Sequence, residues 1–157
     1  MRILVTGCEG TGTHLVHDVI RMSPAFEWDE VITFSVPMMR PPMFQKIGTH
    51  NRIVIMKRSK VHAVYSAWNR FDKRYNRSVK YTLNLYTLAM NRLRCVRHAM
   101  RFDYEDLVAD KDKAMKELSG YLSRKVELYH TIKIENRNDN RWKEDGSFVE
   151  QWNSLTT

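Results

Sequence analysis

Apolar and polar positions follow two spacings along this chain, one typical of strands and one typical of helices. The apolar run at residues 3–5 predicts a buried strand, and the segments at residues 30–36, 52–56 and 99–102 predict three further strands. Between and after these runs, apolar residues recur every three or four positions. This spacing predicts helices at residues 15–20, 61–71, 79–98 and, capped by Asp110, 114–122.

Strands that alternate with helices predict an α/β fold. We expect a single three-layer domain over residues 1–157, with a mainly parallel central sheet and helices on both of its faces. The pattern is weaker after Arg124. There we expect one or two short strands, followed by a polar tail over residues 136–146.

A glycine-rich loop joins the first predicted strand to the first helix. Gly7, Gly10 and Gly12 leave space for successive backbone N–H groups to point into one concavity, and the start of the helix adds its positive end. This layout is typical of a phosphate-binding loop (P-loop), which we expect at the carboxyl edge of the sheet. An ordinary strand-to-helix turn is the alternative, because glycine motifs also occur without a ligand.

The loop departs from the pattern of proteins that hydrolyse ATP or GTP. Gly7 and Gly12 have the spacing of G-x-x-x-x-G-K-[ST], but Thr13 stands at the lysine position and His14 at the position of the magnesium-binding Ser or Thr. The loop therefore predicts an anion site that does not depend on a triphosphate bound to magnesium.

Composition narrows the class of protein. A hydrophobic content of 43% and a charged content of 28% are typical of a globular domain, and we expect no membrane span or signal peptide. The two cysteines, Cys8 and Cys95, imply no disulfide framework, so we expect a cytoplasmic protein. The net charge of +8 favours an anionic partner such as a nucleotide, a nucleic acid or an acidic substrate.

A second candidate anion site follows the third predicted strand. Arg58 stands at the carboxyl edge of the sheet, where open α/β folds bind ligands. Ser66 comes eight residues later, about two turns into the next helix. A planar guanidinium and a rotatable hydroxyl together suit a phosphate monoester. Taken alone, these two residues are better explained as a solvated charge at the end of a strand and a serine without a ligand.

These residues, in this order, resemble the sulfotransferases that use 3′-phosphoadenosine 5′-phosphosulfate (PAPS). Residues 10–13, GTGT, are similar to the [KR]-S-G-T loop of that family. Arg58 and Ser66 are similar to its strand-end Arg and helical Ser, which are also eight apart. Residues 101–107, RFDYEDL, resemble its R-Y-E-D-L segment, and residues 140–143, NRWK, resemble a run near the end of many bacterial members.

The resemblance implies a P-loop type fold and a sulfotransferase that binds PAPS, or its product 3′-phosphoadenosine 5′-phosphate (PAP), without a metal. The implied nucleotide-binding residues are Gly10, Thr11, Gly12, Thr13, His14, Arg58, Ser66 and Arg141. The hydroxyls of Thr11 and Thr13 are expected at the 5′ end of the donor. Arg58 and Ser66 are expected at the 3′-phosphate.

Two departures from the family leave its catalytic groups open. Gly10 stands where the family has Lys or Arg, and the candidates to supply the missing cation are Arg40, Lys46 and Lys57, among which the sequence does not decide. Ser35 stands where one branch has its His base, and the candidate bases are Glu9, His14 and His50. The chain is short for the family, which suggests an open site and a larger hydroxyl or amine acceptor, such as a carbohydrate or a protein side chain.

Other functions remain open at this level. A nucleotide or nucleoside kinase would need the lysine and Ser/Thr that Thr13 and His14 replace. A module without catalysis could bind PAP, or could bind nucleic acid through the basic cluster at residues 70–80, with Tyr75 and Tyr81 interleaved.

Overall fold

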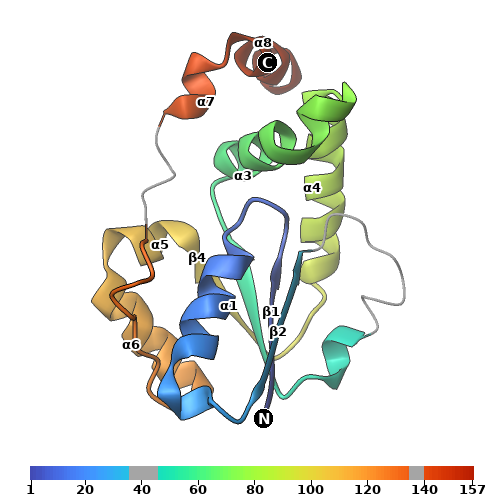
Figure 1. The fold of residues 1–157 in the computed structure, drawn as a ribbon. Coiled ribbons are helices and arrows are strands. Elements are labelled where there is room, and N and C mark those ends of the chain that lie inside the picture. Colours follow the sequence, from blue (N-terminus) through green and yellow to red (C-terminus); the bar gives the residue numbers. More distant parts are fainter. Residues whose placement is uncertain (36–45, 135–139) are drawn as a thin grey trace.

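The computed structural model describes residues 1–35, 46–134 and 140–157. Four parallel strands form its central sheet in the order β2-β1-β3-β4 (Figure 1). Their bounds are Arg2–Gly7 for β1, Glu30–Ser35 for β2, Arg52–Lys57 for β3 and Ala99–Asp103 for β4. All four strands expected from the apolar runs are therefore confirmed, although Val36 lies outside the described residues.

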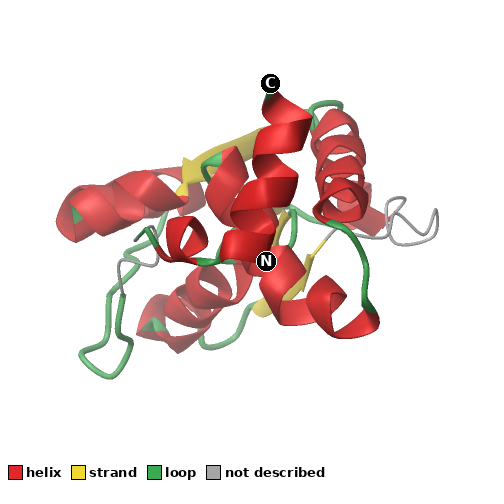
Figure 2. Cartoon of the chain, turned by 90° about the horizontal axis from the view of Figure 1, so that it is seen from above, coloured by secondary structure: helices red, strands yellow, loops and turns green. Residues whose placement is uncertain are grey.

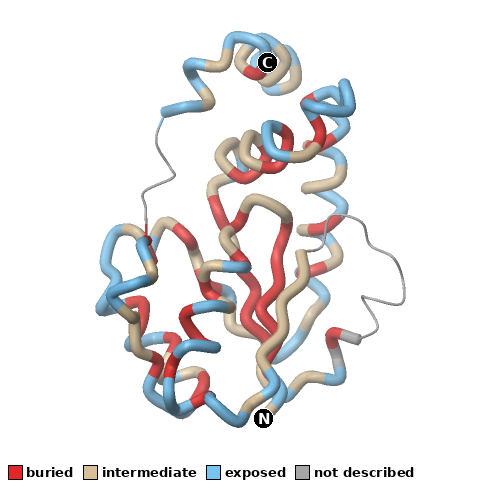
Figure 3. The backbone as a smooth tube through the Cα atoms, viewed as in Figure 1, coloured by how far each residue is buried: buried red, intermediate tan, exposed pale blue. Residues whose placement is uncertain are grey.

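Helices cover both faces of the sheet, as predicted. Ile3 and Val5 of β1 pack in one buried cluster with residues of α1 (Thr13–Met22), α5 (Tyr104–Ala109) and α6 (Lys111–Leu122). Leu4, which points to the opposite face, packs with Ala89 and Leu93 of α4 (Val79–Leu93). The sheet is thus the middle one of three layers, with helices above and below it. Its strands β1 and β3 are the most continuously buried segments of the chain (Figures 1, 2 and 3).

The helices of the middle of the chain lie close to their predicted positions. Helix α3 (Lys60–Ala67) passes directly into a π-helical turn (Trp68–Asp72) and a short 3₁₀ turn (Lys73–Tyr75). Helix α4 ends at Leu93, five residues before the expected end. The guanidinium of Arg101 in β4 donates to the carbonyl oxygens of Leu93 and Val96, at 3.0 and 3.2 Å, and this caps the helix early.

The prediction for the end of the chain is wrong. Residues 124–134 contain no strand, and the expected polar tail contains α7 (Arg141–Glu144) before α8 (Gly146–Thr156) begins. Asp145 caps α8 by accepting from the N–H of Phe148 at 3.2 Å. Phe148 is fully buried and stacks on Trp152 with 5.6 Å between ring centroids. Burial of these aromatic side chains against α3 and α4 stabilises the C-terminal helix.

In the ranges that the structure describes, no helix is long and apolar enough to cross a membrane.

Candidate functional site

The glycine loop follows β1 at the carboxyl edge of the sheet, where the sequence predicted it. Two of its glycines have a left-handed backbone, with φ +78° at Gly10 and +87° at Gly12. A Cβ atom at Gly10 would lie 2.5 Å from the carbonyl oxygen of Ala63, and one at Gly12 would lie 2.8 Å from the ring of Tyr104. The loop therefore packs directly against α3 and α5. The lysine or arginine that the family pattern has at position 10 does not fit this backbone.

The threonines of the loop have different surroundings. The Thr11 hydroxyl donates to the carbonyl oxygen of Cys8 at 2.6 Å, and the residue is 1% exposed, so this side chain holds the loop together. Thr13 starts α1 and its hydroxyl lies 3.4 Å from that of Ser35, at the end of β2. Of the two hydroxyls expected to face a ligand, only that of Thr13 belongs to a residue that lines the cleft described below.

A cleft of about 300 Å³ opens over the loop. Seven residues of the predicted site line it: Glu9, Gly10, Gly12, Thr13, His14, Arg58 and Ser66. Six residues that were not assigned to the site line it as well: Leu15, Ser35, Arg70, Phe71, Tyr104 and Lys133. The polar members include three cations and several hydroxyls. The cleft is thus suited to a ligand with anionic groups.

Arg58 and Ser66 meet at the loop from different elements. Arg58 follows β3 and is only 9% exposed, and its guanidinium donates to the carbonyl oxygen of Gly10 at 2.7 Å. The Cβ of Ser66, on α3, would lie 3.1 Å from a Cβ at Gly10. The two side chains that the sequence placed at one phosphate thus border the same glycine in the same cleft.

The segment over residues 101–107 contacts Arg58 and the start of α3. The Arg58 guanidinium lies over the ring of Tyr104, 4.6 Å from its centroid. The Glu105 carboxylate accepts from the N–H of Ser59 at 2.6 Å, just before α3 begins. This segment therefore fixes both the guanidinium of Arg58 and the start of the helix that carries Ser66.

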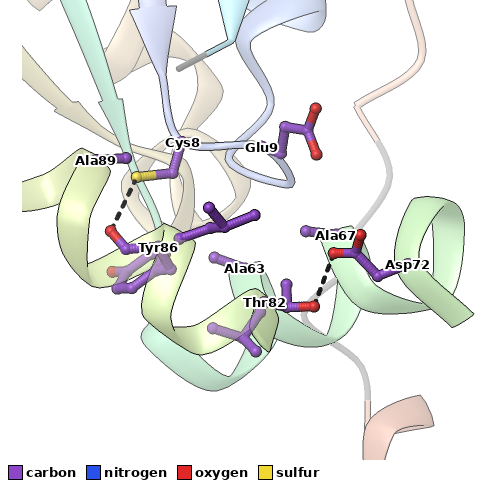
Figure 4. A pocket seen from close by; sticks show the side chains of 10 residues that line it. Cys8, Glu9, Ala63, Ala67, Asp72, Thr82, Tyr86 and Ala89 are labelled. Carbon is purple, nitrogen blue, oxygen red and sulfur yellow. Dashed lines mark hydrogen bonds between the residues drawn. The ribbon is translucent and has the colours of Figure 1, made fainter. Parts of the chain in front are cut away.

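Glu9 lines both the cleft and a second, small cavity, whose lining side chains Figure 4 shows. The cavity holds about 20 Å³, enough for about one water molecule, and Cys8, Asp72 and Thr82 also line it. Thr82 donates to the Asp72 carboxylate at 2.8 Å, and Arg77 pairs with the same carboxylate at 3.1 Å.

The carboxyl of Glu9 and the thiol of Cys8, which line this cavity, both have raised pKa values. Burial and the negative charge of Asp72 raise the pKa of the Glu9 carboxyl, while the nearby Arg70 lowers it. Burial, with a contribution from Glu9, raises the pKa of the Cys8 thiol to about 12. Cys8 is therefore an unreactive, buried thiol.

Several candidate residues lie away from the cleft. His50 precedes β3 at the amino edge of the sheet, where the neighbouring N–H of Asn51 donates to the carbonyl oxygen of Arg2 at 2.9 Å. The structure thus separates His50 from the loop, which argues against it as a base. Arg141 is exposed on α7 and is not among the described residues that line the cleft.

Of the three cations proposed to replace the family's Lys or Arg, the structure describes only the side chain of Lys57, and it is not among the described residues that line the cleft. Arg40 and the side chain of Lys46 lie outside what the structure describes. Lys57 is half-exposed, with its Nζ 3.9 Å from an Asp103 carboxylate oxygen. Instead, Arg70 and Lys133 join Arg58 in the cleft. Arg70 was detectable, because it follows Ser66 by four residues on a helical stretch. Lys133, in an irregular segment, gave no comparable signal.

Among the residues that the structure describes, no three His, Cys, Asp or Glu side chains are grouped so that they could hold a metal ion.

Comparison with known proteins finds similarity in structure alone. No family model and no curated protein sequence matches the chain. Among solved structures, the chain is similar to the crystal structure of mouse sulfotransferase SULT7A1 in complex with PAP, with a TM-score of 0.57 and 15% sequence identity. The match covers 91% of this chain and 64% of that one. The chain therefore has a sulfotransferase-like fold, of the α/β type predicted from the sequence.

Proposed function

We propose that this protein is a sulfotransferase that moves a sulfuryl group from PAPS to a hydroxyl or amine of an acceptor. The observation that carries the proposal is the meeting of Arg58, Ser66 and the glycine loop in one cleft. The similar fold of a sulfotransferase solved with PAP supports it. The expected cytoplasmic location is part of the same proposal.

The cleft has the chemistry that this nucleotide needs. PAP and PAPS carry anionic groups on both sides of a ribose, at the 3′ and 5′ positions. Arg58 and Ser66 offer a guanidinium fork and a hydroxyl for the 3′-phosphate, and the loop offers backbone N–H groups and the Thr13 hydroxyl for the 5′ end. A volume of about 300 Å³ is at the small end of the range for nucleotide-sized pockets.

Positive charge in the cleft supports transfer. PAPS supplies an activated sulfuryl group: the acceptor oxygen bonds to its sulfur, the bond to the 5′-phosphate oxygen breaks, and PAP leaves with the charge. Arg70 and Lys133 are the described cations, besides Arg58, that can stabilise this charge. They take the role that the family gives to a lysine at position 10. Because sulfuryl transfer needs no metal, the proposed reaction is insensitive to chelators.

Glu9 is our first candidate for the base that accepts the proton of the acceptor. It lines the cleft, and its raised pKa brings the carboxyl closer to neutral pH, where a general base works best. His14 also lines the cleft, but it is exposed on the first turn of α1, and it is the second candidate.

A thermal melt with different nucleotides tests the proposal. A ligand present at about 100 times its Kd adds about 2.7 kcal/mol of stability, which should raise the Tm by roughly 5–10 °C for a chain of this size. We expect this shift with PAP and not with ATP and magnesium. A larger shift with ATP and magnesium would favour a kinase, and no shift with PAP would refute the proposal.

Transfer itself is measured with radiolabelled PAPS and a panel of glycans, phenols and tyrosyl peptides, with and without EDTA. We expect transfer in both conditions. PAP binding without transfer to any acceptor would instead favour a protein that binds the nucleotide but does not catalyse.

A further inference from the structure

A row of exposed cations leads away from the mouth of the cleft. Arg70 lines the cleft from the π-helical turn after α3, and Arg74 follows one turn later on the same side. The row continues through Arg77 to Lys80 on the first turn of α4. We call these four cations, with Tyr75 and Tyr81 beside them, the basic ridge. Residues 73–78 of the ridge are all exposed.

Most of the positive charge on the ridge is not neutralised within the protein. Arg77 pairs with Asp72, at 3.1 Å. Among the described residues, Arg70, Arg74 and Lys80 form no ion pair. An exposed cluster of like charges raises the local concentration of anions, so the ridge favours an anionic partner.

The tyrosines of the ridge hold the guanidinium groups in fixed orientations. The Arg74 and Arg77 guanidiniums lie 4.9 and 5.4 Å from the centroid of the Tyr75 ring, and Arg77 lies 4.8 Å from that of Tyr81. Tyr75 is nevertheless 61% exposed. The ridge therefore presents planar guanidinium forks whose orientation is set before a ligand arrives, which suits carboxylate and sulfate groups.

The surroundings of the tyrosine rings distinguish between classes of polyanion. Single-stranded nucleic acid stacks its bases on open aromatic faces, whereas guanidiniums already lie over Tyr75 and Tyr81. An acidic peptide binds firmly through buried apolar anchors, and residues 73–78 contain no aliphatic side chain. An acidic glycan needs neither feature, because its carboxylates pair with guanidiniums and its hydroxyls hydrogen-bond.

We propose that the basic ridge binds an acidic polysaccharide of the uronic acid type and leads it into the cleft as the acceptor. The acceptor role rests on the proposed sulfotransferase function, while binding to the ridge does not. In such a polymer each sugar carries both a carboxylate for the ridge and hydroxyls that can receive the sulfuryl group. Arg70 and Phe71 belong to the cleft wall, so the bound polymer reaches Glu9 without leaving the charged surface.

The test is a titration with a fluorescently labelled oligomer of galacturonic acid, followed by anisotropy at low salt and at increasing salt. The Arg74→Gln/Lys80→Gln double variant should weaken binding about twofold to thirtyfold, since two exposed charge pairs are lost. The control variant, Lys113→Gln/Lys116→Gln, removes two exposed cations of α6 and should bind like the wild type. An uncharged galactose oligomer should not bind.

Three results would overturn the proposal: equal binding by the wild type and the Arg74/Lys80 variant, equal loss in the control variant, or tighter binding of poly-glutamate or single-stranded RNA of the same charge. PAP affinity, measured on the same samples, separates this proposal from the previous one. A wild type that binds PAP but not the oligomer refutes the ridge alone, and one that binds the oligomer but not PAP refutes the sulfotransferase alone.

Discussion

Arg58→Ala should weaken PAP binding through the loss of one charged contact. We propose that Arg58 binds the 3′-phosphate, and a hydrogen bond to a charged group contributes about 1.5–3 kcal/mol. The Kd for PAP should therefore rise by about one to two orders of magnitude. Ser66→Ala should raise it less, because a neutral hydroxyl is lost. Arg58→Lys keeps the charge without the fork and should give an intermediate Kd.

The same substitution also affects the fold, and the structure gives the size of that effect. Arg58 loses its hydrogen bond to the Gly10 carbonyl oxygen, at 2.7 Å, and its position 4.6 Å over the Tyr104 ring. Together these contacts contribute about 2–3 kcal/mol, so the Tm should fall by roughly 4–12 °C. Binding must therefore be measured well below the Tm of the variant, where all of the protein is folded.

Calorimetric titration with two nucleotides separates the two effects. AMP is PAP without the 3′-phosphate, so a direct contact between Arg58 and that phosphate predicts a large loss of affinity for PAP and almost none for AMP. A disturbed loop at Gly10 would weaken both nucleotides, because both have a 5′-phosphate. Equal losses for PAP and AMP in the Arg58→Ala variant would refute the proposed 3′-phosphate contact and leave Arg58 as a support of the loop.

Three further experiments test the packing at two glycines, the reactivity of the two cysteines and the raised pKa of Glu9. Gly10→Ala should lower the Tm, because its φ of +78° and the carbonyl oxygen 2.5 Å away exclude a Cβ; Gly120→Ala, where a Cβ meets nothing within 4 Å in α6, should instead add about 0.5–1 kcal/mol. A loss of stability at both positions would contradict this reasoning. A thiol reagent at pH 8 should modify the exposed Cys95 of the native protein at once and Cys8, with its pKa of about 12, only after unfolding; rapid reaction of both would show that the loop opens. Because burial raises the pKa of Glu9, the folded chain binds more protons than the unfolded chain between the two pKa values, and stability falls as the pH rises through that window. The Tm of the Glu9→Gln variant should therefore rise relative to the Tm of the wild type as the pH rises from about 4 to about 8. A difference in Tm that stays constant with pH would contradict the raised pKa of Glu9.

The two central strands were predictable from the sequence because β1 and β3 are compact apolar runs, and almost all of their residues are buried. The C-terminal helix was not predicted, although its apolar residues Phe148, Trp152 and Leu155 have a helical spacing. The polar residues 136–146 before it predicted a tail instead. The three apolar residues are spaced four and three apart, as on one helical face. The early end of α4 was not predictable, because it depends on Arg101, which reaches back from a strand to the carbonyl of Leu93.

Some features of the candidate site were also predictable from the local sequence, whereas others depend on contacts that form only in the folded protein. Gly10 and Gly12 signalled a loop with special backbone angles, and Arg58 and Ser66 signalled a strand end and a helix that face it. The inward turn of the Thr11 hydroxyl depends on the closed shape of the loop. The spacing of residues in the sequence does not predict the direction of the Thr11 side chain.

One packing contact accounts for the absence of a cation at Gly10, where the sulfotransferase pattern has Lys or Arg. The loop lies so close to α3 that the backbone at Gly10 leaves no room for a side chain beside the carbonyl oxygen of Ala63. The same closeness brings Ser66 to the loop, and the π-helical turn that extends α3 places Arg70 on the wall of the same cleft. A cation supplied by the extension of α3 is therefore the arrangement that this close packing permits. It also makes the positive charge of the cleft continuous with the basic ridge, so the groups that would stabilise the leaving nucleotide and those that would hold an acidic acceptor belong to one segment of the chain.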